Sequence, residues 1–402
     1  MKPSLLIVSA GNLQIPAILK AKKLGYYTIV TDQSPKSPGF SYCDEKILLS
    51  TKDIEGHELL AKKLKKSKNL VGVYTQGADV EYTVAKAAKA AGLPGIDPEV
   101  ARKCNDKILM RELFKSRNVD KVKFQSASNY NKALSAVKKI GFPCIIKPAD
   151  NSASRGITVV ESLSAVKKAF DEAIRNCYHR KEVIIEEFLK GVEYSVDTIV
   201  WDSKVYPCGI SDRTFLRSSK YRIQSGSLTP SLLPSCIQHE MYNLMQKAAL
   251  AIGVDKGAFK GDLILIKNKP KIIEVTARTS GGYDSQYRKP YSFGIDMLKA
   301  TIDIAVGKEL DFRDIVPRWT KWSKTLSVFP KPGKIKKISG IKMAKKIPGV
   351  KDIFILANKG DIVSDYTHSA NRVNFINIVS DTFENLEVIE KMVRKTISYE
   401  MV

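Results

Sequence analysis

Residues 261–276 read Gly-Asp-Leu-Ile-Leu-Ile-Lys-Asn-Lys-Pro-Lys-Ile-Ile-Glu-Val-Thr, two β-rich runs joined by a turn at Asn268. Counted outward from the turn, Asp262 and Glu274 fall opposite each other on one face of the predicted hairpin, which Ile272 shares. Directly opposed cross-strand Cβ atoms lie about 4.5–5.5 Å apart, and like charges placed so are destabilising. Two such carboxylates suit Mg²⁺, which takes one or two carboxylates together with substrate phosphates. The hairpin alone is equally compatible with acids at a solvated end, or with a register shifted by one residue.

A second group of residues surrounds Lys147. This lysine ends a buried strand, Pro148 stops the strand from continuing, and Asp150-Asn-Ser-Ala-Ser-Arg-Gly156 forms a small polar loop. Such a loop can turn its backbone N–H groups toward phosphates while the lysine supplies a point charge. Taken alone, these residues are an ordinary turn, and Lys107, on a predicted helix, is an ordinary surface lysine.

A third group follows another strand, at Glu186-Glu-Phe-Leu189 and Gly191-Val-Glu-Tyr-Ser-Val-Asp197. An edge strand with these residues can pair its free backbone groups with a purine while Glu193 holds ribose hydroxyls. In isolation, the same residues read simply as the charged end of a strand.

The N-terminal part predicts a parallel sheet. Buried β-rich runs, such as residues 5–8, alternate with helical patterns, which is typical of βαβ units. The G-x-G-x-x-G run of a dinucleotide-binding fold is missing. Ligands usually bind beyond the carboxyl ends of parallel strands, so residues 9–14 and 75–79 are candidates for the substrate site.

The remainder predicts a mixture of helices and strands, and a chain of 402 residues predicts two or three domains. We expect one helix over residues 98–117, helices alternating with strands over 123–189, and strands with one helix over 193–275. Another helix over 294–306 precedes an irregular stretch, several strands and a final helix from Glu384.

The bulk composition favours a soluble cytoplasmic protein. The six cysteines lack C-x-x-C spacing, which favours reduced thiols over a zinc or redox motif. No apolar run approaches the ~20 residues that cross a bilayer, and the apolar N-terminal run reads as a core strand rather than a signal peptide. The net charge of +24 is spread along the chain without an aromatic-studded basic ribbon. Specific nucleic-acid recognition is therefore disfavoured against a solvated surface that attracts anionic metabolites.

The order of these pieces resembles the ATP-grasp superfamily over nearly the whole chain. The motifs are D-K at residues 106–107, K-P with its loop at 147–156, E-E-F-x-x-G-x-E-Y-S-V-D from 186, and G-D, hairpin, E-V-x-x-R-x-S-G-G from 261 to 282. The pattern is most similar to the branch that includes biotin carboxylase, carbamoyl-phosphate synthetase, aminoimidazole-ribonucleotide carboxylase and L-amino-acid ligases.

This resemblance implies a multidomain α/β and α+β protein. A Rossmann-like preATP-grasp domain would occupy residues 1–97, and a two-lobed ATP-grasp domain would occupy residues 98–310. Within the latter, residues 123–190 would form a mobile lid lobe. Residues 311–402 would form a C-terminal closing domain.

The resemblance also implies the site residues. Asp262 and Glu274 would hold Mg²⁺ (or Mn²⁺), with Thr276 as a further ligand, and Arg278 would face the transferring phosphate or the acyl phosphate. Lys107 and Lys147 would contact the ATP phosphates, and a loop with Ser154, Arg155 and Gly156 would cover those phosphates. The adenine slot would be lined by Glu186, Glu187, Phe188 and Leu189. Glu193 would bind the ribose.

Two residues depart from the family pattern. Ala153 stands where a glycine is common, so closure of the phosphate loop can differ. Thr276 stands where asparagine is usual, so the pattern supports one magnesium ion better than two. Both acids and both lysines are retained, which argues against an inactive relative.

The implied reaction converts a carboxylate to an acyl phosphate, which an amine or similar nucleophile attacks while ADP and phosphate leave. Alternatives are a bicarbonate-dependent carboxylase, or a nucleotide-binding protein without turnover. The expected partners are small molecules, and a homodimer is compatible with the resemblance. The identity of the substrates stays open. Arginines suit carboxylates and phosphates, and those that can face a substrate are Arg213, Arg217, Arg222 and Arg288.

Overall fold

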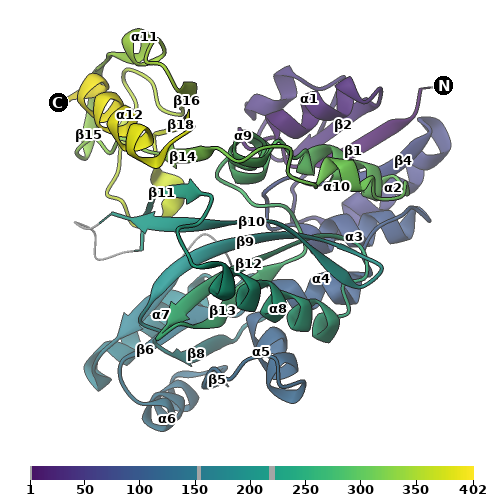
Figure 1. Cartoon of the computed structure of the whole chain (residues 1–402). Helices are drawn as coiled ribbons and strands as arrows, with labels where there is room; N and C mark the ends of the chain where they lie inside the picture. The colour runs from purple at the N-terminus through teal and green to yellow at the C-terminus, as the bar shows by residue number, and fades with distance from the viewer. Residues whose placement is uncertain (1, 152–154, 217–221) are drawn as a thin grey trace.

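The computed structural model describes residues 2–151, 155–216 and 222–402. Within these ranges the strands form four sheets, of which the eight-stranded sheet is the largest (Figure 1). Figure 1 shows this central sheet between the N-terminal sheet with its helices and the lobe that carries β5 to β8. The sequence correctly predicts a mixed α/β architecture.

The N-terminal sheet has the strand order β3-β2-β1-β4, and every pair in it is parallel, as predicted. All five residues of β1 are buried, which fits a strand covered by helices on both faces. The strands are β1 (Ser4–Val8), β2 (Tyr27–Asp32), β3 (Glu45–Leu48) and β4 (Leu70–Tyr74), and the helices are α1 (Ile15–Lys23), α2 (Ile54–Ser67) and α3 (Glu81–Ala90).

The single helix expected over residues 98–117 is wrong, because two helices meet there. The first is α4 (Pro98–Asn105) and the second is α5 (Lys107–Ser116). Asp106 between them has an extended backbone, and its carboxylate accepts hydrogen bonds from Ile108 N and Leu109 N. Asp106 is thus an N-cap, and this cap places Lys107 at the first position of α5.

The lobe over residues 124–187 carries an antiparallel sheet in the order β5-β8-β6-β7. Two helices pack on it and complete a small separate core that includes Ile146, Phe170 and Ile185. The elements are β5 (Phe124–Ala127), α6 (Tyr130–Ile140), β6 (Cys144–Pro148), β7 (Thr158–Val160), α7 (Val166–Arg175) and β8 (Val183–Glu187). A core of its own allows the lobe to move as a unit.

The central sheet has the order β13-β12-β9-β10-β11-β14-β18-β16. Helix α8 (Ser235–Ile252) packs on it, and Met241, Met245 and Phe259 are fully buried in the shared core. The strands are β9 (Val192–Trp201), β10 (Lys204–Phe215), β11 (Gln224–Thr229), β12 (Gly257–Ile266), β13 (Lys269–Thr276), β14 (Trp322–Leu326), β16 (Val350–Ile355) and β18 (Asn374–Ser380).

Strands from the C-terminal part extend the central sheet, because β14 pairs with β11 and β18 pairs with β14. A three-stranded sheet that the sequence analysis missed lies beside them. The remaining elements are α9 (Lys289–Phe293), α10 (Met297–Ala305), β15 (Gly333–Ser339), α11 (Ile341–Ala344), β17 (Ile362–Val363), α12 (Phe383–Thr396) and β19 (Ser398–Met401). The domain boundaries at residues 97 and 310 stay predictions.

Within the described ranges, every helix is too short or too polar to span a bilayer.

Candidate active site

The two acids of the hairpin meet as predicted, because Asp262 on β12 pairs directly with Glu274 on β13. Lys267 and Asn268 form the turn with positive φ angles of 47° and 62°. A β-bulge after Asp262 shifts the register and places Ile272 opposite Leu263, where both lie in the buried core. The expectation that Ile272 shares the face of the acids is therefore wrong, since a bulge exchanges the faces.

Cations surround both acids. Asp262 lies 2.6 Å from Lys260 Nζ and 3.1 Å from Arg213 Nη1, and Glu274 Oε2 lies 3.4 Å from Lys107 Nζ. Burial raises the pKa of each carboxyl, but Arg213 and Lys260 lower that of Asp262, and Lys107 lowers that of Glu274, below their ordinary values. Both acids are therefore ionised at neutral pH, as metal ligands are.

Two buried oxygens at this place have no hydrogen-bond donor among the described residues: Asp262 Oδ1 and Thr276 Oγ1. Arg213 lies within ion-pair distance of the first but does not donate to it with hydrogen-bond geometry. Buried polar atoms are usually hydrogen-bonded, so unsatisfied oxygens need an explanation. Two ionised carboxylates with a nearby hydroxyl fit a hard, oxygen-preferring dication such as Mg²⁺.

Lys107 connects the paired acids to the polar loop after β6. Its Nζ donates to Asn151 O at 2.7 Å while lying 3.4 Å from Glu274. The side chain is only 9% exposed. The structure thus brings one predicted phosphate-binding lysine to the metal ligands and to the loop.

Lys147, the other predicted lysine, lies against Glu186. Its Nζ is 2.7 Å from Glu186 Oε2, and Arg111 Nε donates to Glu186 Oε1 at 2.8 Å. Burial would raise the pKa of Glu186, but Arg111 and then Lys147 lower it to about 2. Burial lowers the pKa of Lys147 against the opposing effect of Glu186. The ionised carboxylate of Glu186 thus contacts both cations, Lys147 and Arg111.

Both carboxylate oxygens of Glu186 are therefore engaged by Arg111 and Lys147. The carboxylate of Glu187 accepts from Lys123 N at 3.0 Å, and Phe188 N donates to Pro143 O at 3.1 Å. Glu187, Phe188 and Leu189 are half-buried where β8 ends. The adenine slot stays a prediction.

Glu193, predicted to bind ribose, lies between two arginines. Its carboxylate forms a close ion pair with Arg222 and lies 3.4 Å from Arg213 Nη1. Arg213 also reaches Asp262, so it connects the predicted ribose acid with the predicted metal acid.

The predicted phosphate loop is anchored at both sides of its described part. Asp150 accepts hydrogen bonds from the backbone N–H groups of residues 178–180, and Arg155 Nη1 donates to Tyr178 Oη at 3.2 Å. Gly156 has a φ of +69°, and a Cβ there would lie 2.8 Å from that of Asn176. The predicted loop residue Ser154 and the predicted substrate arginine Arg217 lie outside the described residues.

Arg278 is held by two acids from the N-terminal part. Its guanidinium forms a close ion pair with Asp79, and its Nε lies 3.3 Å from Glu81 Oε1. Gln76 Nε2 donates to Ser280 O at 2.9 Å, which joins the predicted substrate loop at residues 75–79 to the loop after β13. Gln14 in turn donates to Gln76 O. The candidate loop at residues 75–79 thus contacts the loop that follows β13, and the candidate loop at residues 9–14 contacts Gln76.

A cationic recess lies beside the same loop. Gly282, Arg288, Arg372 and Gln224 are among its lining residues. Arg288 is 2% exposed and paired with Asp284 at 2.6 Å, whereas Arg372 has no acidic partner within 4.0 Å among the described residues. Burial, together with Arg213 and Arg288, lowers the pKa of Arg372 to about 9. Because positive charge is concentrated in this recess, it favours the binding of an anion.

The residues that escaped the sequence analysis include Arg111, Glu81, Lys260 and Arg372. Arg111 follows Lys107 by four positions, which places both on one helix face, so the D-K motif contained a signal for it. Glu81 and Arg372 are brought in by tertiary contacts that no spacing along the chain reveals.

Comparisons with known proteins show what this chain is similar to. A model of the phosphoribosylglycinamide synthetase ATP-grasp (A) domain matches residues 105–282, and a model of L-amino acid ligase C-terminal domain 2 matches residues 326–402. An alanine–anticapsin ligase of Bacillus subtilis is 27% identical over 255 residues, which are 58% of this chain and 53% of that protein. The chain therefore spans about half the length of that relative.

Solved structures share the fold over the full length of this chain. The L-amino acid ligase of Bacillus licheniformis has a TM-score of 0.83 at 20% identity, and the phosphoribosylglycinamide synthetase of Anaerococcus prevotii has a TM-score of 0.79 at 23% identity. In both comparisons 100% of each chain is covered. The matched residues 105–282 contain the paired acids and the lobe over residues 124–187, and they identify an ATP-grasp domain. The chain belongs to the ATP-grasp superfamily, as its motifs predict.

Proposed function

We propose that this protein is an ATP-dependent carboxylate–amine ligase that forms an acyl phosphate and releases ADP and phosphate. The observation that carries the proposal is the direct pairing of Asp262 with Glu274, with Lys107 Nζ 3.4 Å from the latter. Both matching family models are named after ligases, and this supports amide formation over carboxylation.

Each part of the site has a distinct task in this reaction. Asp262 and Glu274, with Thr276, would hold Mg²⁺, which neutralises charge on the phosphates when it is bound. Lys107 and Lys147 position the phosphates, since phosphoryl transfer depends mainly on positioning and charge neutralisation. Closing the lid lobe excludes water that would hydrolyse the acyl phosphate.

We place the carboxylate substrate at the cationic recess that Arg288 and Arg372 line, beside Gly282 in the loop that follows Glu274. Arg288 and Arg372 supply planar donors that suit a carboxylate or phosphate. This supports an anionic first substrate. We also place the protein in the cytoplasm, with small-molecule partners.

The test is a screen for ADP formation with Mg²⁺ across small carboxylates paired with amines and amino acids. Hydroxylamine, added in place of the amine, should trap the acyl phosphate as a hydroxamate. A ligase yields ADP only when the carboxylate is present, and yields hydroxamate with hydroxylamine. ADP formation with bicarbonate alone would instead favour the carboxylase reaction, and ATP binding without ADP formation would exclude both.

A further inference from the structure

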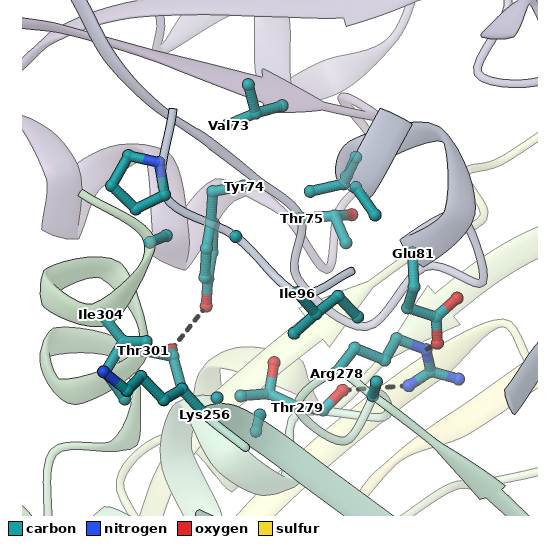
Figure 2. A pocket seen from close by; sticks show the side chains of 18 of the residues that line it. Val73, Tyr74, Thr75, Glu81, Ile96, Lys256, Arg278, Thr279, Thr301 and Ile304 are labelled. Carbon is teal, nitrogen blue, oxygen red and sulfur yellow. Dashed lines mark hydrogen bonds and ion pairs between the residues drawn. The ribbon is translucent and has the colours of Figure 1, made fainter. Parts of the chain in front are cut away.

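A cavity of about 370 Å³ lies behind Arg278, where three parts of the chain meet. Its walls come from β4 and α3, from the strand ends near residues 255–258 and 277–279, and from α10 (Figure 2). The volume is within the range of small-molecule sites, about 300–1,000 Å³. Among the residues proposed to bind nucleotide or metal, only Arg278 lines it. The cavity therefore shares Arg278 with the proposed ATP site, and it also shares Thr75 with the candidate substrate loop.

Most of the cavity wall is apolar, so it suits the body of a compact apolar molecule. Residues from several elements contribute, and they include Val73, Val84, Ile96, Ala258 and Ile304. Trp201 also lines the wall.

The polar groups gather at two ends. Figure 2 shows Glu81 with Arg278 on one side and Tyr74 with Thr301 on the other, where the two hydroxyls lie 2.9 Å apart. Glu81 is 2% exposed, and its Oε1 accepts no hydrogen bond among the described residues although Arg278 Nε lies 3.3 Å away. A buried carboxylate oxygen without a donor is costly, and a donor on a ligand would remove that cost.

The charges at this end favour a cation. Asp79 and Glu81 both face the single guanidinium of Arg278, so two acids share one cation. Lys256 and Lys308 line the cavity too, but their side chains are 48% and 55% exposed and each has an acidic partner, Asp202 or Asp303. Exposed, paired lysines attract an anion weakly. The buried carboxylate of Glu81 therefore makes the cavity favour a cationic ligand over an anionic one.

We propose that this cavity binds a compact apolar amine, whose ammonium group donates to Glu81 Oε1 while its apolar body fills the cavity. Glu81 also accepts from Asn105 Nδ2 at 3.0 Å, just ahead of Asp106 and Lys107. A ligand on Glu81 thus contacts a residue that joins Arg278 to the last residue of α4, two positions before Lys107. Occupancy of the cavity would bias the position of both proposed phosphate-binding groups.

Binding is measured on the full chain without ATP, so the result does not depend on the proposed reaction. The probe is 2-phenylethylamine, and 3-phenylpropionate is the matched probe of similar size and opposite charge. The amine should change the fluorescence of Trp201, and the change should be lost in Trp201→Phe, which keeps Trp319 and Trp322. The amine should bind at least tenfold more tightly than the acid, a difference of about 1.4 kcal/mol.

Two variants separate this site from non-specific binding. Val84→Phe fills the cavity and should weaken amine binding at least tenfold, whereas Val388→Phe, the same change at a 50% exposed position on α12, should not. Glu81→Gln should abolish the preference for the amine over the acid. The proposal is overturned if the two probes bind equally to the wild type, if Trp201→Phe keeps the signal, or if the amine causes no signal. The proposal is also overturned if Val84→Phe and Val388→Phe bind the amine equally tightly.

Discussion

Lys147 and Glu186 form a buried ion pair across two neighbouring strands, with Nζ 2.7 Å from Oε2 and both side chains 4% exposed. Arg111 completes the group from α5. Because one carboxylate holds a lysine and an arginine, the lysine proposed to bind phosphate is oriented before any nucleotide arrives. Through Arg111, this group also connects the lobe over residues 124–187 to α5, the helix that begins at Lys107.

Replacing Glu186 by Gln should therefore destabilise the protein, by about 3–5 kcal/mol at neutral pH, since breaking a buried pair leaves charge uncompensated. The pKa of Glu186 is about 2 in the folded protein and higher in the unfolded chain. Wild-type stability from this group is present above about pH 4.5 and is lost as the pH falls toward 2. Urea unfolding at several pH values should show that this loss is smaller in Glu186→Gln.

Glu172→Gln is the matched control for that change, because its exposed pair with Arg175 is worth little. Equal neutral-pH stability of the two variants would show that Glu186 does not hold the cations as the distances indicate.

Replacing Glu274 by Gln should lower Mg²⁺-dependent ADP formation about 100-fold or more, because a metal ligand contributes several kcal/mol of charge stabilisation. The variant should keep its helical circular dichroism, since Glu274 is partly exposed and lies outside the apolar core. ADP formation is measured across a magnesium titration, with the exposed Glu240→Gln as control. Wild-type rates at low magnesium in Glu274→Gln would contradict the proposed metal site.

Sequence reasoning predicted the hairpin pairing because its evidence is local. Counting outward from Asn268 pairs Asp262 with Glu274, and the structure has this pair. The turn, however, consists of Lys267 and Asn268, and counting outward from these two residues would place Ile273 opposite Asp262. The bulge after Asp262 adds the residue that brings Glu274 into place. The same counting misplaced Ile272, because one bulged residue reverses the alternation and leaves no mark in the sequence.

Contacts between segments that lie far apart in the sequence could not be predicted by counting residues along a hairpin. Glu81 reaches Arg278 across almost half of the chain, and Arg372 joins Arg288 through the C-terminal extension of the central sheet. The break at Asp106 had a local signal, an N-cap aspartate, but the flanking helical pattern on both sides concealed it.

Replacing Thr276 by Val should separate stability from metal binding. The hydroxyl is buried and has no donor or acceptor among the described residues, so its removal should leave the free energy of unfolding unchanged or raise it by up to about 1 kcal/mol. If Thr276 helps to hold magnesium, the variant needs more magnesium for half-maximal ADP formation. Thr276→Ser keeps the hydroxyl and should behave like the wild type. A Val variant with an unchanged magnesium requirement would remove Thr276 from the metal site.

Replacing Glu81 by Gln should change how stability depends on pH near neutrality. Burial raises the pKa of Glu81 to about 7, against the opposing effect of Arg278. Because the folded protein holds this proton more tightly than the unfolded chain does, the wild type should lose stability as the pH rises from about 4.5 to about 7. Urea unfolding across this interval should show a flatter dependence in Glu81→Gln. The exposed Glu99→Gln should keep the wild-type slope. Parallel curves for wild type and Glu81→Gln would mean that Arg278 holds Glu81 ionised throughout.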